Sequence, residues 1–190
     1  MIDLATLPAF LDRLAGAAAD SIMPHFRAGA AVANKQTTHF DPVTIADRTA
    51  EQAMRAIIAA TYPGHGIVGE EFGSERADAE FVWVLDPIDG TRSFITGLPV
   101  WGTLIGLMRA GRPILGMMAQ PFTGERFAGD GKRAWYTGPG GARPLKTRPC
   151  AALDLASLFT TTPALFAGEE RAAYDRVEAA VRLPRYGCDC

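Results

Sequence analysis

The chain has 190 residues, enough for one large domain or two small ones with a substantial core. Hydrophobic residues make up 48% and charged residues 21%, and the net charge is −2, so no basic surface indicates nucleic acid or an anionic membrane as a partner. The three cysteines lack the spacing of a disulfide framework and no apolar run has the roughly 18 residues of a membrane span, so a reduced, cytoplasmic protein without a membrane segment is expected.

The first part of the chain predicts two amphipathic helices with a loop between them. Apolar residues recur at spacings of three and four over 4–22, and this helix should end near Pro24. Residues 29–43 are rich in Gly, Ala, Thr and Asn, which favours a short hairpin and a mobile loop. A second helix is expected over 44–62, with a buried stripe formed by Ile45, Thr49, Ala53, Ile57 and Ala60.

Short apolar runs bounded by turn residues predict strands in the middle of the chain. Two buried strands are expected at 66–69 and 81–85, and two hairpins follow them. The hairpins comprise 101–107 with 114–120, joined by a tight turn at 109–112, and 125–128 with 133–136.

The last part of the chain predicts a return to alternating elements. A loop rich in Gly, Pro and Arg is expected over 138–149, a strand over 158–161 and a helix over 169–181. Val177 and Val181 should lie on the apolar face of that helix. Helices, then a strand meander, then renewed alternation indicate a layered α/β (α+β) fold.

Carboxylates follow the two predicted buried strands at the point where each strand ends. Glu70 follows the first, and Asp86 and Asp89 follow the second. We expect Pro87 to stop the second strand, so that the two aspartates converge across a turn with the Ile88 carbonyl facing the same space. Mg²⁺ prefers oxygen ligands of this kind, so the sequence predicts a magnesium site here.

The residues around this site each have a structural alternative. Gly90 and Thr91 could begin a short helix whose free N–H groups favour an anion. Taken alone, however, Asp86 and Asp89 are better explained as caps of a turn and a helix. Asp47, in Thr-Ile-Ala-Asp, is better explained as part of a capping box. The site hypothesis depends on all these groups meeting at one edge of one sheet.

Three segments together resemble the inositol monophosphatase superfamily. They are Asp-Pro-Val-Thr-Ile-Ala-Asp at 41–47, Gly-Glu-Glu at 69–71 and Trp-Val-Leu-Asp-Pro-Ile-Asp-Gly-Thr at 83–91. The resemblance implies a layered αβαβα sandwich that forms a homodimer and hydrolyses a small-molecule phosphate monoester. It also implies dependence on two to three Mg²⁺ ions per site and inhibition by Li⁺.

The resemblance assigns the metal ligands residue by residue. Glu70, Asp86 and the Ile88 carbonyl would bind the first ion, and Asp86 and Asp89 would bind a second. Glu70 would also hold a third, weaker ion and is counted among the catalytic residues.

The resemblance further assigns the residues that handle substrate and water. Gly90 and Thr91 would hold phosphate through their backbone N–H groups, and Thr91 and Asp47 would orient and deprotonate the attacking water. Arg92 and Asp189 would contact the organic part of the substrate. Water would attack phosphorus directly, without a covalent phosphoenzyme.

Flanking stretches resemble the histidinol-phosphatase branch of this superfamily. They are residues 93–107, 111–116, 120–121, 160–163 and 185–190. This resemblance implies L-histidinol phosphate as substrate, in histidine biosynthesis, with Asp189 pairing with the substrate's amino group. Inositol 1-phosphate or another sugar phosphate is the alternative substrate.

The family also carries a metal-binding Asp in a Trp-Asp-x-Ala motif, which this sequence does not contain. We therefore expect residues 1–190 to be the N-terminal two-thirds of one phosphatase domain. Residues 1–137 would form its metal-site half and 138–190 the start of a second α/β half. An inactive remnant that acts only by binding is the alternative of a different class.

Overall fold

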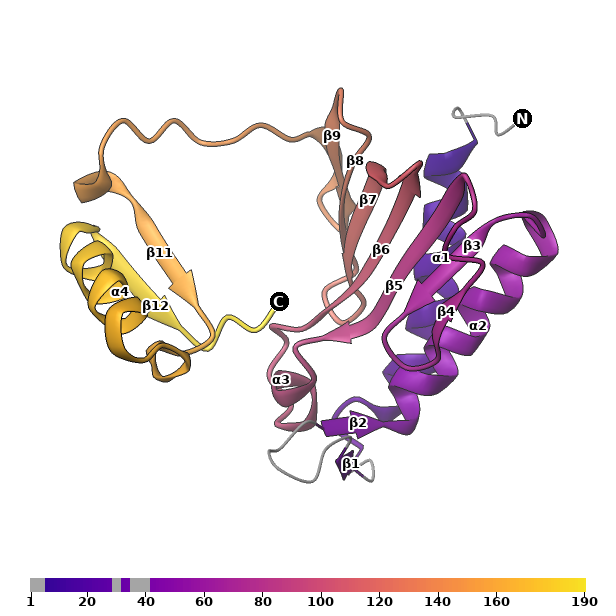
Figure 1. Cartoon of the computed structure of the whole chain (residues 1–190), viewed down its shortest axis with the longest axis horizontal. Helices are drawn as coiled ribbons and strands as arrows, with labels where there is room; N and C mark the ends of the chain where they lie inside the picture. Colours follow the sequence, from indigo (N-terminus) through magenta and orange to yellow (C-terminus); the bar gives the residue numbers. More distant parts are fainter. Residues whose placement is uncertain (1–5, 29–31, 35–41) are drawn as a thin grey trace. The chain divides into compact units, whose positions relative to one another are not determined.

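The structure is a computed structural model that describes residues 6–28, 32–34 and 42–190. The chain forms two compact units, Met1–Leu145 and Lys146–Cys190 (Figure 1). The expected hairpin is present as β1 (Val32–Asn34) paired antiparallel with β2 (Pro42–Thr44), whereas the expected mobile loop lies outside the described residues. Within the described ranges, no helix is both long and apolar enough to cross a lipid bilayer.

The first unit is built on one eight-stranded sheet with the order β10-β9-β8-β7-β6-β5-β3-β4. β3 and β5 run parallel, and all other neighbours run antiparallel. The predicted hairpins are confirmed. The strands are β3 (Gly66–Gly69), β4 (Gly73–Glu75), β5 (Phe81–Asp89), β6 (Gly102–Arg109), β7 (Arg112–Gln120), β8 (Glu125–Gly129), β9 (Ala134–Gly138) and β10 (Gly141–Pro144).

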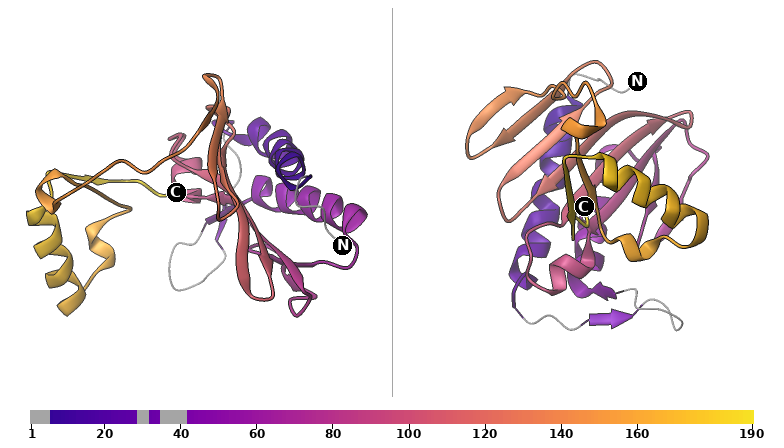
Figure 2. Two further views of the ribbon diagram at one scale, coloured as in Figure 1. Left: turned by 90° about the horizontal axis from the view of Figure 1, so that it is seen from above. Right: turned by 90° about the vertical axis from the view of Figure 1, so that its left-hand side faces the viewer.

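Helices α1 (Leu7–Ile22) and α2 (Ile45–Thr61) cover one face of this sheet (Figure 2). The short 3₁₀ helix η1 (Met23–His25) ends α1 at the predicted place, while the predicted start at Leu4 lies outside the described residues. The core forms between the helices and the sheet. Its largest fully buried side chains include Leu11, Leu14, Met54, Ile58, Trp83, Trp101, Ile105 and Leu107.

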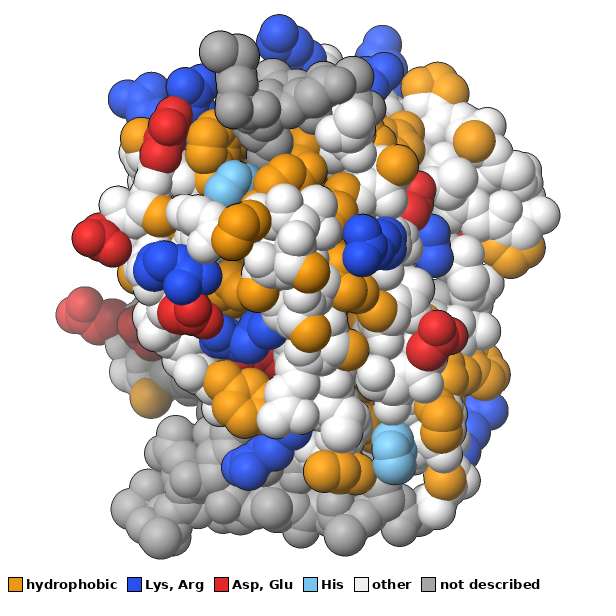
Figure 3. Space-filling view, turned by 90° about the vertical axis from the view of Figure 1, so that its right-hand side faces the viewer, with side chains coloured by type: hydrophobic (Ala, Val, Ile, Leu, Met, Phe, Trp, Pro, Cys, Tyr) orange, Lys and Arg blue, Asp and Glu red, His pale blue; other side chains and the backbone are white. Residues whose placement is uncertain are grey.

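The predicted buried stripe of α2 is wrong. Ile45 is 53% exposed, and the buried side chains are Ala46, Asp47, Ala50, Glu51, Met54 and Ile58. Two carboxylates lie on the buried face, so a pattern based on apolar residues alone selects the neighbouring face. On the face seen in Figure 3, acidic, basic and apolar side chains are mixed, and the basic side chains of the described residues form no continuous surface.

Two further expectations for the first unit are corrected. Strand β5 does not stop at Pro87 but continues to Asp89, with a register shift against β6 between Asp86 and Asp89. Such an irregularity accommodates a proline, which lacks the N–H that a regular ladder needs. The predicted loop over 138–149 contains strand β10, which pairs with β9.

The second unit contains a small parallel βαβ arrangement. Strands β11 (Ser157–Thr160) and β12 (Leu183–Tyr186) pair in parallel, and α4 (Gly168–Ala180) lies between them in the chain. The 3₁₀ helices η2 (Leu153–Leu155) and η3 (Pro163–Leu165) flank β11. The strand and helix predictions are confirmed here, but Val177, assigned to the apolar face of the helix, is exposed.

Candidate active site

Parallel pairing of β3 with β5 brings the predicted acidic residues together. Gly69 pairs with Leu85, so the next residues lie side by side: Glu70 directly after the end of β3, and Asp86 within β5. The Glu70 backbone N–H donates to the Leu85 carbonyl at 3.2 Å, which extends the pairing by one step. Carboxyl ends of neighbouring parallel strands are a common place for ligand sites, as the sequence argument required.

The electrostatics of Asp86 show that four of the predicted carboxylates share one environment. Burial, then a hydrogen bond with Glu70 and the negative charges of Glu70, Asp89 and Asp47, together raise the pKa of Asp86 to about 8. The Oδ1 atom of Asp86 is buried and accepts no hydrogen bond from the described residues. Full ionisation of the site would therefore place more negative charge there than its own hydrogen bonds compensate.

Asp47 is both a helix cap and a member of this cluster. It is the third residue of α2 and is 1% exposed. Its Oδ2 atom accepts hydrogen bonds from the backbone N–H of Thr44 at 2.8 Å and from the Thr44 hydroxyl at 2.6 Å. The predicted capping box is thus confirmed, and it fixes the carboxylate whose charge acts on Asp86.

The segment after β5 begins a short helix, α3 (Thr91–Ile95), as expected. Gly90 precedes it with φ of 90°, a left-handed conformation that favours glycine. The Thr91 hydroxyl donates to the Ile88 carbonyl at 3.1 Å, and its assignment to orienting the attacking water stays a prediction. Arg92 is exposed on α3, and Asp189 lies in the second unit after β12, so their assignment to substrate binding also stays a prediction.

The donor set suits a hard divalent cation. Carboxylate oxygens of Glu70, Asp86 and Asp89 and the Ile88 carbonyl are ligands of the type that Mg²⁺ prefers, and the buried Oδ1 of Asp86 is a ready acceptor. Among the described residues, no group of three or more His, Cys, Asp or Glu side chains is arranged so that it could hold a metal ion. Mg²⁺ commonly keeps several waters and uses few protein ligands, so partial coordination by the chain fits its chemistry.

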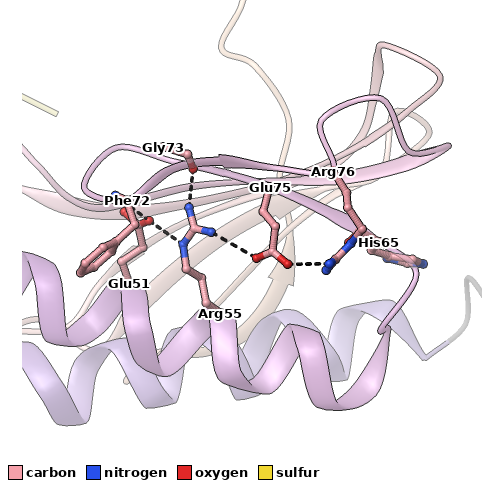
Figure 4. Close-up of polar contacts among 7 residues, drawn as sticks. All are labelled: Glu51, Arg55, His65, Phe72, Gly73, Glu75 and Arg76. Carbon is pink, nitrogen blue, oxygen red and sulfur yellow. Dashed lines mark hydrogen bonds and ion pairs between the residues drawn. The ribbon is translucent and has the colours of Figure 1, made fainter.

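Two residues that support this edge, Glu51 and Arg55, are not among the residues predicted from the sequence (Figure 4). The Glu51 carboxylate accepts hydrogen bonds from the backbone N–H groups of Glu71 and Phe72, directly after Glu70. Arg55 pairs with Glu51 at 2.8 Å. The available signal was spacing, because Glu51 follows Asp47 by four residues and shares its face of α2.

Comparisons with known proteins agree with this geometry. A family model described as the inositol monophosphatase family matches residues 3–189. The chloroplastic bifunctional phosphatase IMPL2 of Arabidopsis thaliana is 47% identical over 180 residues, which cover 93% of this chain and 50% of that protein. The histidinol-phosphatase of Mycobacterium tuberculosis is 40% identical over 119 residues, which cover 62% of this chain and 46% of that protein.

A solved structure supports the same relationship. The inositol monophosphatase from Zymomonas mobilis matches with a TM-score of 0.82 and 43% identity, over 99% of this chain and 72% of that one. This likeness confirms the expected layered α/β fold with its large mixed sheet. The chain spans about half the length of the curated relatives that it matches.

Proposed function

We infer that this protein hydrolyses a phosphate monoester with the help of Mg²⁺, because the chain belongs to the inositol monophosphatase family and gathers carboxylates at one sheet edge. The observation that carries the inference is the pKa of Asp86, which burial and then neighbouring carboxylates raise to about 8. Negative charges held this close and partly away from water are stabilised by a cation. A divalent cation would also attract the phosphate of a substrate.

Glu70, Asp86, Asp89 and the Ile88 carbonyl would hold the cation, in line with the family resemblance. Two to three ions per site are proposed on the same basis. Mg²⁺ bound there would lower the pKa of a water molecule and offset the negative charge of the phosphate. The buried Oδ1 of Asp86 supports this assignment, since it accepts no hydrogen bond from the described part of the chain.

Residues of the chain would position the reacting groups. Asp47, fixed by its bonds to Thr44, would take a proton from the attacking water, which Thr91 would orient. The backbone N–H groups of Gly90 and Thr91 would hold phosphate oxygens at the start of α3. The new bond from water to phosphorus would form as the ester P–O bond breaks, so no covalent phosphoenzyme is proposed.

We propose L-histidinol phosphate as the substrate. The similarity to the Mycobacterium tuberculosis histidinol-phosphatase supports it, as do the flanking stretches at 93–107 and 111–116. Inositol 1-phosphate is the second candidate, favoured by the likeness to the Zymomonas mobilis inositol monophosphatase. A homodimer is proposed on the family resemblance and is tested by light scattering of the purified chain.

Phosphate release from both substrates, with Mg²⁺ and with EDTA, tests the proposal. We expect Mg²⁺-dependent release that is faster from L-histidinol phosphate. Asp89→Asn should abolish this release, whereas Asp78→Asn, the same chemical change at an exposed position, should not. Faster release from inositol 1-phosphate would favour the second substrate. Mg²⁺ binding without release from either substrate would favour a protein that acts only by binding.

A further inference from the structure

Glu51 is a fully buried carboxylate outside the proposed set of ligands. Its side chain is 0% exposed, and it lies four residues after Asp47 on the same face of α2. Oε2 accepts a hydrogen bond from the Glu71 backbone N–H at 2.7 Å, and Oε1 accepts from the Phe72 N–H at 3.2 Å and from Arg55 Nε at 2.8 Å. A buried charge needs such partners, and here two of the three belong to one turn of the backbone.

Arg55 contacts the same turn one residue further along. Its Nη2 donates to the Gly73 carbonyl, and its Nη1 lies 3.9 Å from Glu75 Oε2 on β4 (Figure 4). Glu51 and Arg55 are one helical turn apart and pair with each other. Helix α2 therefore binds the backbone of three consecutive residues, at positions 71 and 72 in the turn after β3 and at 73, the first residue of β4.

This turn begins at Glu70, which the proposed function makes a ligand. On the N-terminal side of Glu70, its own backbone N–H donates to the Leu85 carbonyl. On the C-terminal side, the backbone N–H of Glu71 donates to the Glu51 carboxylate. The backbone of Glu70 is thus held on both sides, with its carboxyl hydrogen-bonded to Asp86. We propose that Glu51 is a positioning residue that holds the turn after β3 and thereby sets the affinity of the carboxylate site for Mg²⁺; this inference rests on the proposed function.

Gly69 supports the inference independently. A Cβ atom built on Gly69 would lie 2.0 Å from Glu51 Oε1, a distance that real contacts do not reach. The absence of a side chain at Gly69 is therefore what admits the Glu51 carboxylate to the turn. An alanine at position 69 would force the Glu51 carboxylate away without changing the charge of that carboxylate. The backbone conformation of Gly69 is one that alanine can adopt.

The expected effect is on cation affinity rather than on stability alone. Glu51→Gln keeps the size of the side chain but replaces one acceptor oxygen by an NH₂ donor, which cannot accept from an N–H group. Loss of groups that orient metal ligands typically lowers metal affinity by about 10- to 100-fold. We expect a loss in this range for Glu51→Gln and for Gly69→Ala.

The test combines Mg²⁺ titration calorimetry with amide hydrogen–deuterium exchange on the 190-residue chain. Both variants should bind Mg²⁺ at least tenfold more weakly and should lose exchange protection over residues 66–76. The matched control is Met54→Ala, which removes a fully buried side chain from the same helix and should lower the unfolding temperature while keeping both properties. If Glu51→Gln does not fold, Gly69→Ala carries the test.

The outcomes separate the inference from the proposed function. Weaker Mg²⁺ binding in both variants and normal binding in Met54→Ala supports the inference. Unchanged Mg²⁺ affinity in a folded Glu51→Gln or Gly69→Ala chain overturns it, as does an equal loss in Met54→Ala. Absence of Mg²⁺ binding by the unsubstituted chain overturns the proposed function itself, while the exchange data still show whether Glu51 holds the turn.

Discussion

Replacing Asp86 by asparagine should stabilise the metal-free chain and remove its affinity for Mg²⁺. Burial, the hydrogen bond with Glu70 and the charges of Glu70, Asp89 and Asp47 raise the Asp86 pKa from 3.8 to about 8. Because the folded-state pKa lies above the unfolded-state value, the contribution of Asp86 to the free energy of unfolding is complete below about pH 4. This contribution is lost as the pH rises toward 8. Asparagine has no such proton to lose and can still donate a hydrogen bond to Glu70.

The magnitude follows from the same pKa. pH 7 lies about 3.2 units above 3.8, the ordinary pKa of an aspartate. At about 1.36 kcal/mol per unit, keeping Asp86 protonated at pH 7 costs the folded chain at most about 4 kcal/mol. Water reaches part of the Asp86 side chain and neighbouring carboxylates share in the titration, so a gain of about 2 kcal/mol is expected. At pH 5 the same reasoning leaves a gain below about 1 kcal/mol.

Urea denaturation at pH 5 and pH 7 in EDTA measures these differences directly. Added Mg²⁺ should then raise the stability of the unsubstituted chain at pH 7 and leave that of Asp86→Asn unchanged, because only the former binds the cation. Asp78→Asn, at an exposed position, is the control and should change neither quantity. A loss of stability in Asp86→Asn at pH 7, or an equal gain at both pH values, would refute the reasoning.

Three further changes test parts of the fold. Gly90→Ala should lower the free energy of unfolding by about 1–2 kcal/mol because its φ is 90°, whereas Gly64→Ala, with open space around it, should not; urea midpoints compare them. Thr44→Val should cost about 1 kcal/mol, read by thermal denaturation, because the α2 cap is lost; an unchanged midpoint would contradict the capping role. Burial lowers the pKa of His65, whose Nδ1 accepts from Trp83 at 3.1 Å. The contribution of His65 to the free energy of unfolding should therefore be complete above pH 6.5 and decrease as the pH falls below it. His65→Phe should reduce this pH dependence, measured by urea denaturation.

Much of the site could be predicted because its residues follow local rules. Glu70 and Asp86 each come directly after a short apolar run, and such runs read as buried strands. The capping signature that includes Asp47 is also local. What the residues alone could not supply was the pairing of β3 with β5, which places Glu70 next to Asp86. Here the family resemblance, rather than periodicity, supplied the missing long-range information.

The errors share a physical cause, which is the compensation of unfavourable residues by distant partners. The buried face of α2 carries Glu51, whose charge is balanced by N–H groups about 20 residues away in the chain. Strand β5 tolerates Pro87 because its register shifts there and because the Thr103 hydroxyl donates to the Pro87 carbonyl at 2.8 Å. Neither partner is visible in a local window, so hydrophobic pattern and proline rules both point the wrong way.

The polar row on α2 links the proposed chemistry to the core of the fold. Asp47, Glu51 and Arg55 recur every four residues, so they lie close to one line along the helix. Asp47 adds its charge to the carboxylate cluster, and Glu51 holds the turn that carries Glu70. Arg55 pairs with Glu51 and donates to the Gly73 carbonyl. An inserted residue between Asp47 and Glu51 would rotate one against the other by about 100°. Both could then no longer face the sheet edge, so the spacing of this row constrains the site as strongly as the identity of its residues.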